Sequence, residues 1–105
     1  MIEYRILKEL EHNPESSQRT LAQKLDVSLG KINYVLGGLA EKGIIKAQRL
    51  TTDPRNIRWS YLLTPMGIRE KVRIAKQYLD NRIKEFDEIQ QEIIELKKEV
   101  PLDTL

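Results

Sequence analysis

Apolar positions in the first 43 residues recur with the spacing of amphipathic helices, which predicts three short helices in succession. The first covers about residues 2–11 and ends before Asn13-Pro14, because the residue before a proline disfavours helical backbone. The second covers residues 18–25 and the third about residues 28–42, with serines as N-caps and Gly43 as the final C-cap. The residues predicted to face inward are Ile2, Ile6, Leu7, Leu10, Leu21, Ala22, Leu25, Ile32, Val35, Leu36 and Leu39.

After Gly43 the apolar period changes from 3.6 to 2, which is typical of β-strands. Residues 44–50 and 57–63 are the two strand candidates, and the polar, proline-containing residues 51–56 form a turn between them. This segment is therefore a predicted hairpin. Trp59 shares a strand face with Ile57 and Tyr61, so we expect it to lie in the core.

A long helix should follow, because Thr64-Pro65 is an N-cap with proline at the first helical position and no strong breaker occurs before Pro101. Such a helix has about 36 residues and is about 55 Å long at about 1.5 Å per residue. Its apolar residues follow a 3.5-residue repeat, which predicts a coiled coil. The seam contains Val72, Leu79, Phe86, Ile93 and Val100 at position a, and Ile68, Ala75, Arg82, Ile89 and Leu96 at position d. Arg82 alone breaks the apolar rule.

The predicted fold class is mainly α with a β-hairpin wing: a winged helix-turn-helix over residues 1–63 and a long dimerisation helix over residues 64–105. A module of this size is too small to cover such a helix, which favours a homodimer over a helix packed on its own domain. Residues 64–84 carry a net charge of +4 and residues 85–105 carry −5. Antiparallel pairing is therefore favoured, although Glu92 and Lys97 would also form a good pair in a parallel coil.

Charge is unevenly distributed in a chain whose net charge is only +2. Residues 17–58 contain eight basic and three acidic residues, a net charge of +5. A basic middle segment is the electrostatic footprint expected for nucleic acid, although a solvated basic surface would look the same.

The third helix presents polar residues on the face opposite its apolar stripe, at the end that enters the major groove in helix-turn-helix proteins. Lysine can donate to guanine acceptors and asparagine can form two hydrogen bonds with adenine. A glycine there allows close backbone approach. We therefore predict DNA contacts, rather than an ordinary polar surface, for Ser28, Gly30, Lys31, Asn33 and Tyr34.

Two further groups complete the predicted DNA-binding surface. Ser17, Gln18 and Arg19 begin the second helix, where free N–H groups and the helix dipole suit a phosphate. Arg49, Arg55 and Arg58 lie on the wing, and arginine suits a narrow minor groove. Arg55, at the tip, is the strongest of the three candidates.

Several segments resemble one family. These are residues 18–25 (Gln-Arg-Thr-Leu-Ala-Gln-Lys-Leu), Val27-Ser28, residues 39–45 (Leu-Ala-Glu-Lys-Gly-Ile-Ile) and residues 63–67 (Leu-Thr-Pro-Met-Gly). The chain resembles the MarR-type winged-helix transcriptional regulators. Residues 27–34 and 61–68 are similar, more narrowly, to the small MarR-like regulators associated with exopolysaccharide gene clusters. The resemblance extends to about residue 100 and implies sequence-specific DNA binding by the third helix. The chain departs from full-length MarR proteins in lacking a separate N-terminal dimerisation helix and a second C-terminal helix, so no small-molecule effector is assigned.

Other classes find little support in the sequence. The chain has no cysteine, one histidine, no Ser-His-Asp set and no glycine-rich phosphate loop, so we expect no catalytic residues, metal site or cofactor. No apolar run is long enough for a membrane span and no signal peptide is expected, which predicts a cytoplasmic protein.

The sequence thus favours a homodimeric regulator that binds double-stranded DNA. Two alternatives stay open: a protein-interaction adaptor that uses the winged helix and the coiled coil, and a nonspecific DNA-packaging protein.

Overall fold

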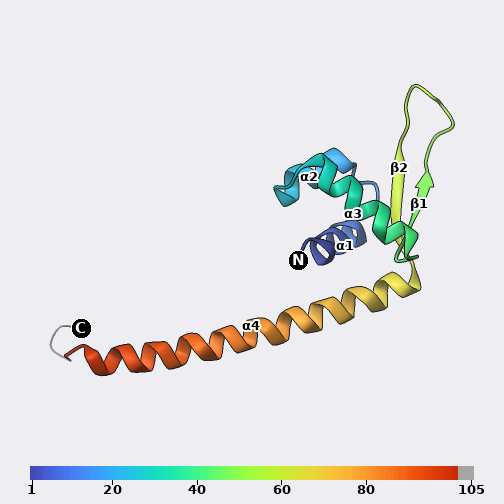
Figure 1. Cartoon of the computed structure of the whole chain (residues 1–105). Coiled ribbons are helices and arrows are strands. Elements are labelled where there is room, and N and C mark those ends of the chain that lie inside the picture. The colour runs from blue at the N-terminus through green and yellow to red at the C-terminus, as the bar shows by residue number, and fades with distance from the viewer. Residues whose placement is uncertain (102–105) are drawn as a thin grey trace. The chain divides into compact units, whose positions relative to one another are not determined.

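The computed structural model describes residues 1–101 of the 105-residue chain. In order it contains α1 (Ile2–His12), α2 (Gln18–Leu25), α3 (Leu29–Glu41), β1 (Ile45–Arg49), β2 (Trp59–Leu63) and α4 (Pro65–Glu99) (Figure 1). The predicted fold class, helical with a hairpin wing and a long C-terminal helix, is confirmed. The structure divides into two compact units, Met1–Ile74 and Ala75–Leu105. Residues 102–105, the end of the predicted dimerisation segment, lie outside the described residues.

Three of the helices begin at predicted hydroxyl caps. Ser17 Oγ accepts a hydrogen bond from the Thr20 N–H at 3.0 Å, and Ser28 Oγ accepts one from the Lys31 N–H at 3.0 Å. Thr64 Oγ1 accepts one from the Gly67 N–H, also at 3.0 Å. Each cap satisfies a donor that the first helical turn leaves without an intrahelical partner, so a hydroxyl residue next to the helix marks each of these starts.

The core of the first unit lies between α1, α2 and α3 and is closed by the hairpin. Ile6, Leu7, Leu10, Leu21 and Ile32 are fully buried. All of the predicted inward residues of these helices are buried except Ile2, which is partly buried against the cluster. Ile44, Ile45 and Tyr61 of the hairpin segment complete the core.

The wing is an antiparallel pair in which Ile45 lies opposite Leu63 and Arg49 lies opposite Trp59. The Tyr61 N–H donates to the Pro14 carbonyl at 2.8 Å, which ties β2 to the loop between α1 and α2. The prediction that Trp59 lies in the core is wrong, because its side chain is 43% exposed and Ile57 is 57% exposed. Within β2 only Ser60 and Tyr61 are buried, and the pattern of alternation cannot tell where that burial stops.

The first turns of α4 lie close to the rest of the unit Met1–Ile74. A Cβ atom at Gly67 would be 2.0 Å from the carbonyl oxygen of Ile44, so only glycine fits there. Lys71 Nζ lies 2.6 Å from Glu11 Oε2 on α1. The hydrogen bond from Lys71, followed by its charge, lowers the pKa of the Glu11 carboxyl group. The pKa of Glu70 is also lowered, mainly by a hydrogen bond from Arg73. Glu11 is exposed and Glu70 is half-buried at the surface, so these pairs add little stability.

The predicted seam of α4 is largely exposed. The eight large apolar seam residues have exposed fractions from 38% at Val100 to 64% at Val72. Arg82 Nη1 donates to Glu85 Oε2 at 2.9 Å on the same helix. Ile83 and Ile94, which lie outside the predicted seam, are also about half exposed, at 50% and 48%.

None of the helices in residues 1–101 is both long enough and apolar enough to cross a bilayer.

Candidate nucleic-acid interface

Helix α3 has two chemically distinct faces. Ile32, Val35, Leu36 and Leu39 are buried against the other helices. The five polar or small residues predicted for DNA contact, which are Ser28, Gly30, Lys31, Asn33 and Tyr34, are all exposed in the structure. Tyr34 is 78% exposed, the largest value among the large apolar and aromatic side chains of residues 1–101. A Cβ atom at Gly30 would meet nothing within 4 Å, so the surface is open there.

The start of α2 contributes a second group of predicted residues. Ser17 and Arg19 are exposed and Gln18 is half-buried. The Ser17 hydroxyl is already engaged, because it accepts from the Thr20 N–H and donates to Thr20 Oγ1 at 2.9 Å. Ser17 therefore acts as a cap, and the groups left for an anion at this end are backbone N–H groups and the Arg19 side chain.

The three wing arginines occupy different parts of the hairpin. Arg49 ends β1, Arg58 immediately precedes β2, and Arg55 lies in the turn between them. All three are exposed. The turn is ordered by Asp53, whose Oδ1 accepts from the Arg55 N–H at 2.9 Å. This local bond fixes the backbone that carries Arg55.

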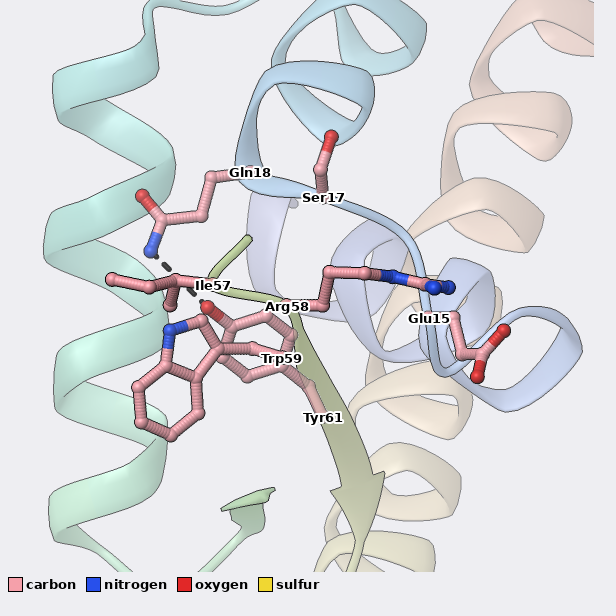
Figure 2. A pocket seen from close by; sticks show the side chains of 7 residues that line it. All are labelled: Glu15, Ser17, Gln18, Ile57, Arg58, Trp59 and Tyr61. Atoms are coloured by element: carbon pink, nitrogen blue, oxygen red, sulfur yellow. Dashed lines mark hydrogen bonds between the residues drawn. The ribbon is translucent and has the colours of Figure 1, made fainter. Parts of the chain in front are cut away.

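A cleft of about 230 Å³ lies between the start of α2 and the start of β2. Figure 2 shows the rings of Trp59 and Tyr61 beside Gln18, and the Arg58 side chain extending toward Glu15. Gln18 Nε2 donates to the Tyr61 hydroxyl at 3.2 Å. The cleft is lined by Glu15, Ser17, Gln18, Ile57, Arg58, Trp59 and Tyr61.

The structure brings some of the predicted residues together. Ser17, Gln18 and Arg58 share the cleft, and Asn33 Nδ2 donates to Gln18 Oε1 at 3.3 Å. The sequence only placed Tyr61 on the strand face of Ile57 and Trp59, yet its hydroxyl is joined to this group. Its position on a strand face gave no signal for that bond, because Gln18 is 43 residues away in the sequence.

Residues 1–101 contain no cluster of three or more His, Cys, Asp or Glu side chains that could hold a metal ion.

The chain is similar to a DNA-binding domain family and to two named transcriptional regulators. Residues 2–46 match the family described as winged helix-turn-helix DNA-binding. A protein of Thauera aromatica, whose name assigns it to transcriptional regulation of the hcr operon, is 37% identical over 73 residues. That match covers 70% of this chain and 43% of the relative. The HTH-type transcriptional regulator Ptr1 of Methanocaldococcus jannaschii is 31% identical over 88 residues, covering 84% of this chain and 58% of Ptr1. The chain thus spans about half the length of these two curated relatives.

Solved structures agree on the fold. A MarR/EmrR family transcriptional regulator from Acinetobacter sp. ADP1 superposes with a TM-score of 0.61 at 26% identity, covering 93% of this chain and 71% of that one. The regulator BldR from Sulfolobus solfataricus gives a TM-score of 0.64 at 23% identity, covering 94% and 73% of the two chains. Together with the match over residues 2–46 and the order of helices and wing in this chain, these similarities show a winged helix-turn-helix fold similar to that of the MarR/EmrR family regulator.

Proposed function

We propose that the protein is a transcriptional regulator that binds specific double-stranded DNA sequences as a homodimer. The observation that carries this proposal is the division of α3 into a buried apolar face and an exposed face with Lys31, Asn33 and Tyr34. Residues of about 28–42 would enter the major groove and the wing, about residues 45–63, would lie near the minor groove. The names of the two curated relatives, both transcriptional regulators, support the same function.

Each group of exposed residues has a chemical role in this proposal. Lys31 and Asn33 carry donors and acceptors that suit guanine and adenine edges. The N-terminus of α2 with Arg19 suits a phosphate, which fixes the position of the protein on the duplex. Arg55, at the turn of the wing, suits the negative potential of a narrow minor groove.

Binding to DNA should weaken steeply as the salt concentration rises, because the winged helix-turn-helix of each copy offers roughly four to six groups that can contact phosphates. For a dimer we expect the logarithm of the binding constant to fall with the logarithm of salt concentration with a slope steeper than about −6. Lys31→Ala should weaken binding to the selected sequence by roughly 1–3 kcal/mol and binding to random DNA much less. Fluorescence anisotropy with both DNAs measures the two losses.

Lys98→Ala is the matched control, since this exposed lysine lies in the last turn of α4, outside the proposed DNA surface. It should leave both affinities unchanged. An equal loss on selected and random DNA would make Lys31 a phosphate contact. Equal affinity of the unmodified protein for all sequences would favour a nonspecific DNA-packaging protein instead.

A second copy of the chain is the proposed occupant of the exposed seam on α4. Burial of each large apolar side chain of this seam would stabilise the protein by about 1.5–3 kcal/mol relative to leaving it in water. A parallel or antiparallel partner helix of the same sequence would cover it along its whole length. The same stripe is what favours the adaptor hypothesis, in which a different protein covers it. Light scattering of the purified protein separates the two, because a homodimer needs no other component.

The two copies of α4 are proposed to pair antiparallel. This arrangement sets the basic residues 64–84 of one copy beside the acidic residues 85–105 of the other. Ile68 would then lie beside Val100 of the second copy, and Phe86 beside Arg82, whose guanidinium can lie over the ring. Ile68→Cys and Val100→Cys test this, because the chain has no native cysteine. Each variant oxidised alone should stay uncrosslinked, and a disulfide should form after the variants are mixed and allowed to exchange subunits. Efficient crosslinking of Ile68→Cys alone, with no gain on mixing, would establish parallel pairing.

A further inference from the structure

Three polar side chains connect the wing to the exposed face of α3. Asn33 Nδ2 on α3 donates to Gln18 Oε1 on α2 at 3.3 Å, and Gln18 Nε2 donates to the Tyr61 hydroxyl on β2 at 3.2 Å. Figure 2 shows the second of these bonds. We call Asn33, Gln18 and Tyr61 the amide–phenol chain. All three residues belong to the unit Met1–Ile74.

The two ends of the amide–phenol chain differ in burial. The Tyr61 side chain is 8% exposed and belongs to the hydrophobic core, and its backbone N–H is bonded to the Pro14 carbonyl. The fold therefore fixes the position of the phenol oxygen. Gln18 is half-buried and Asn33 is exposed. The chain of bonds thus runs from a rigid group in the core to a carboxamide on the surface.

The bonds determine how the carboxamide of Asn33 is turned. An unrestrained asparagine side chain can exchange its oxygen and nitrogen by rotation, and only one orientation matches a given base edge. In the structure one N–H of Asn33 is bonded to Gln18. The second N–H and the oxygen Oδ1 remain for another partner. One donor beside one acceptor is the pattern that complements N7 and N6 of adenine in the major groove.

We propose that Gln18 and Tyr61 are positioning residues that hold Asn33 in the orientation that recognises adenine at one position of the DNA site. This inference rests on the proposed DNA-binding function. Tyr61 acts without touching DNA. Its hydroxyl holds the Gln18 carboxamide, and the orientation of Gln18 then sets the direction of the hydrogen bond from Asn33. The preference for adenine at that position is therefore greater than Asn33 would provide alone, since a fixed group loses less freedom on binding.

The experiment starts with selection of binding sites from random DNA by the unmodified full chain. Asn33→Ala then identifies the base pair at which the preference depends on Asn33, and we expect an A·T pair. Tyr61→Phe keeps the ring in the core and removes only the hydroxyl. It should reduce the preference for adenine at that base pair by roughly three- to tenfold, the range expected for one hydrogen bond. The change at other base pairs and on random DNA should be much smaller.

Two further variants make the result specific. Tyr4→Phe makes the same chemical change on α1, outside the amide–phenol chain, and should leave the preference unchanged. Gln18→Met removes both hydrogen bonds from the middle of the chain and should reduce the same preference, whatever happens to total affinity. In an Asn33→Ala background, Tyr61→Phe should cause no further change at that base pair, because the two residues act through one path. Thermal melting of each variant verifies folding.

The outcomes separate this inference from the function on which it rests. If the unmodified protein selects no sequence, the proposed function fails. If it selects a sequence but Asn33→Ala alters no single base pair, or Tyr61→Phe and Gln18→Met leave that base pair unaffected, DNA recognition stands and the positioning role is overturned. A loss from Tyr61→Phe that is equal on all sequences also overturns it, since that pattern reflects packing alone.

Discussion

Leu79→Asp is expected to convert the proposed dimer into monomers with a largely unfolded C-terminal helix. Leu79 is 56% exposed at the centre of the α4 seam, and in a dimer both copies of the substitution would enter the interface. A buried carboxylate without a partner costs roughly several kcal/mol, in addition to the apolar burial that is lost. The helix beyond Ile74 has little else to stabilise it, because isolated helices are marginal in water.

Light scattering and far-UV circular dichroism measure the two parts of this effect, mass and helicity. Gln77→Asp is the matched control, because Gln77 is also exposed on α4 but lies outside the seam. It should leave the mass and the helix signal unchanged. A Leu79→Asp protein that stayed dimeric at micromolar concentration would contradict the proposed interface, and Phe86→Asp provides a second test at another turn.

The second large effect is expected at Gly67. In Gly67→Ala the new Cβ atom would lie 2.0 Å from the Ile44 carbonyl oxygen, so backbone must move where α4 begins. Overpacking of this kind costs about 1–3 kcal/mol, and we expect the upper part of that range because the obstructing atom is backbone. For a domain of this size the melting temperature should fall by roughly 8–20 °C.

Gly37→Ala is the control for this prediction, because Gly37 also lies inside a helix but its Cβ would meet nothing within 4 Å. Alanine has the higher helix propensity, so this variant should be more stable by about 0.5–1 kcal/mol. Opposite shifts in melting temperature for the two glycines would establish close approach at residue 67 as the cause. Equal shifts would show that Gly67 has no special role.

Local signals in the sequence predicted most of the fold. Ser17, Ser28 and Thr64 each lie directly before a helix, and in the structure each caps its first turn. Apolar spacing identified the buried faces of α1, α2 and α3 because a helix packed on one side imposes that spacing. Such features depend on residues three or four positions apart, which a single sequence displays directly.

Features that depend on distant residues were harder to predict. Alternation placed Trp59 and Tyr61 on one strand face, but it could not show that the fold buries Tyr61 and leaves Trp59 43% exposed. The hydrogen bond of Tyr61 to Gln18 spans 43 positions, and the clash of a Cβ at residue 67 with Ile44 spans 23. Both arise from how the elements pack. The DNA-contact residues and the dimer seam remain predictions.

Trp59 has a practical consequence as a natural optical probe. It is the only tryptophan in the chain, and it lines the cleft beside Gln18 and Arg58. Its emission should therefore change when DNA occupies the proposed surface, without any attached dye. The far-UV signal, in contrast, is dominated by helices, of which the 35-residue α4 is the longest among residues 1–101. Melting curves followed by Trp59 emission report on the unit Met1–Ile74, whereas far-UV curves include helices of both units. Their coincidence or separation therefore measures whether the two units unfold in one cooperative step.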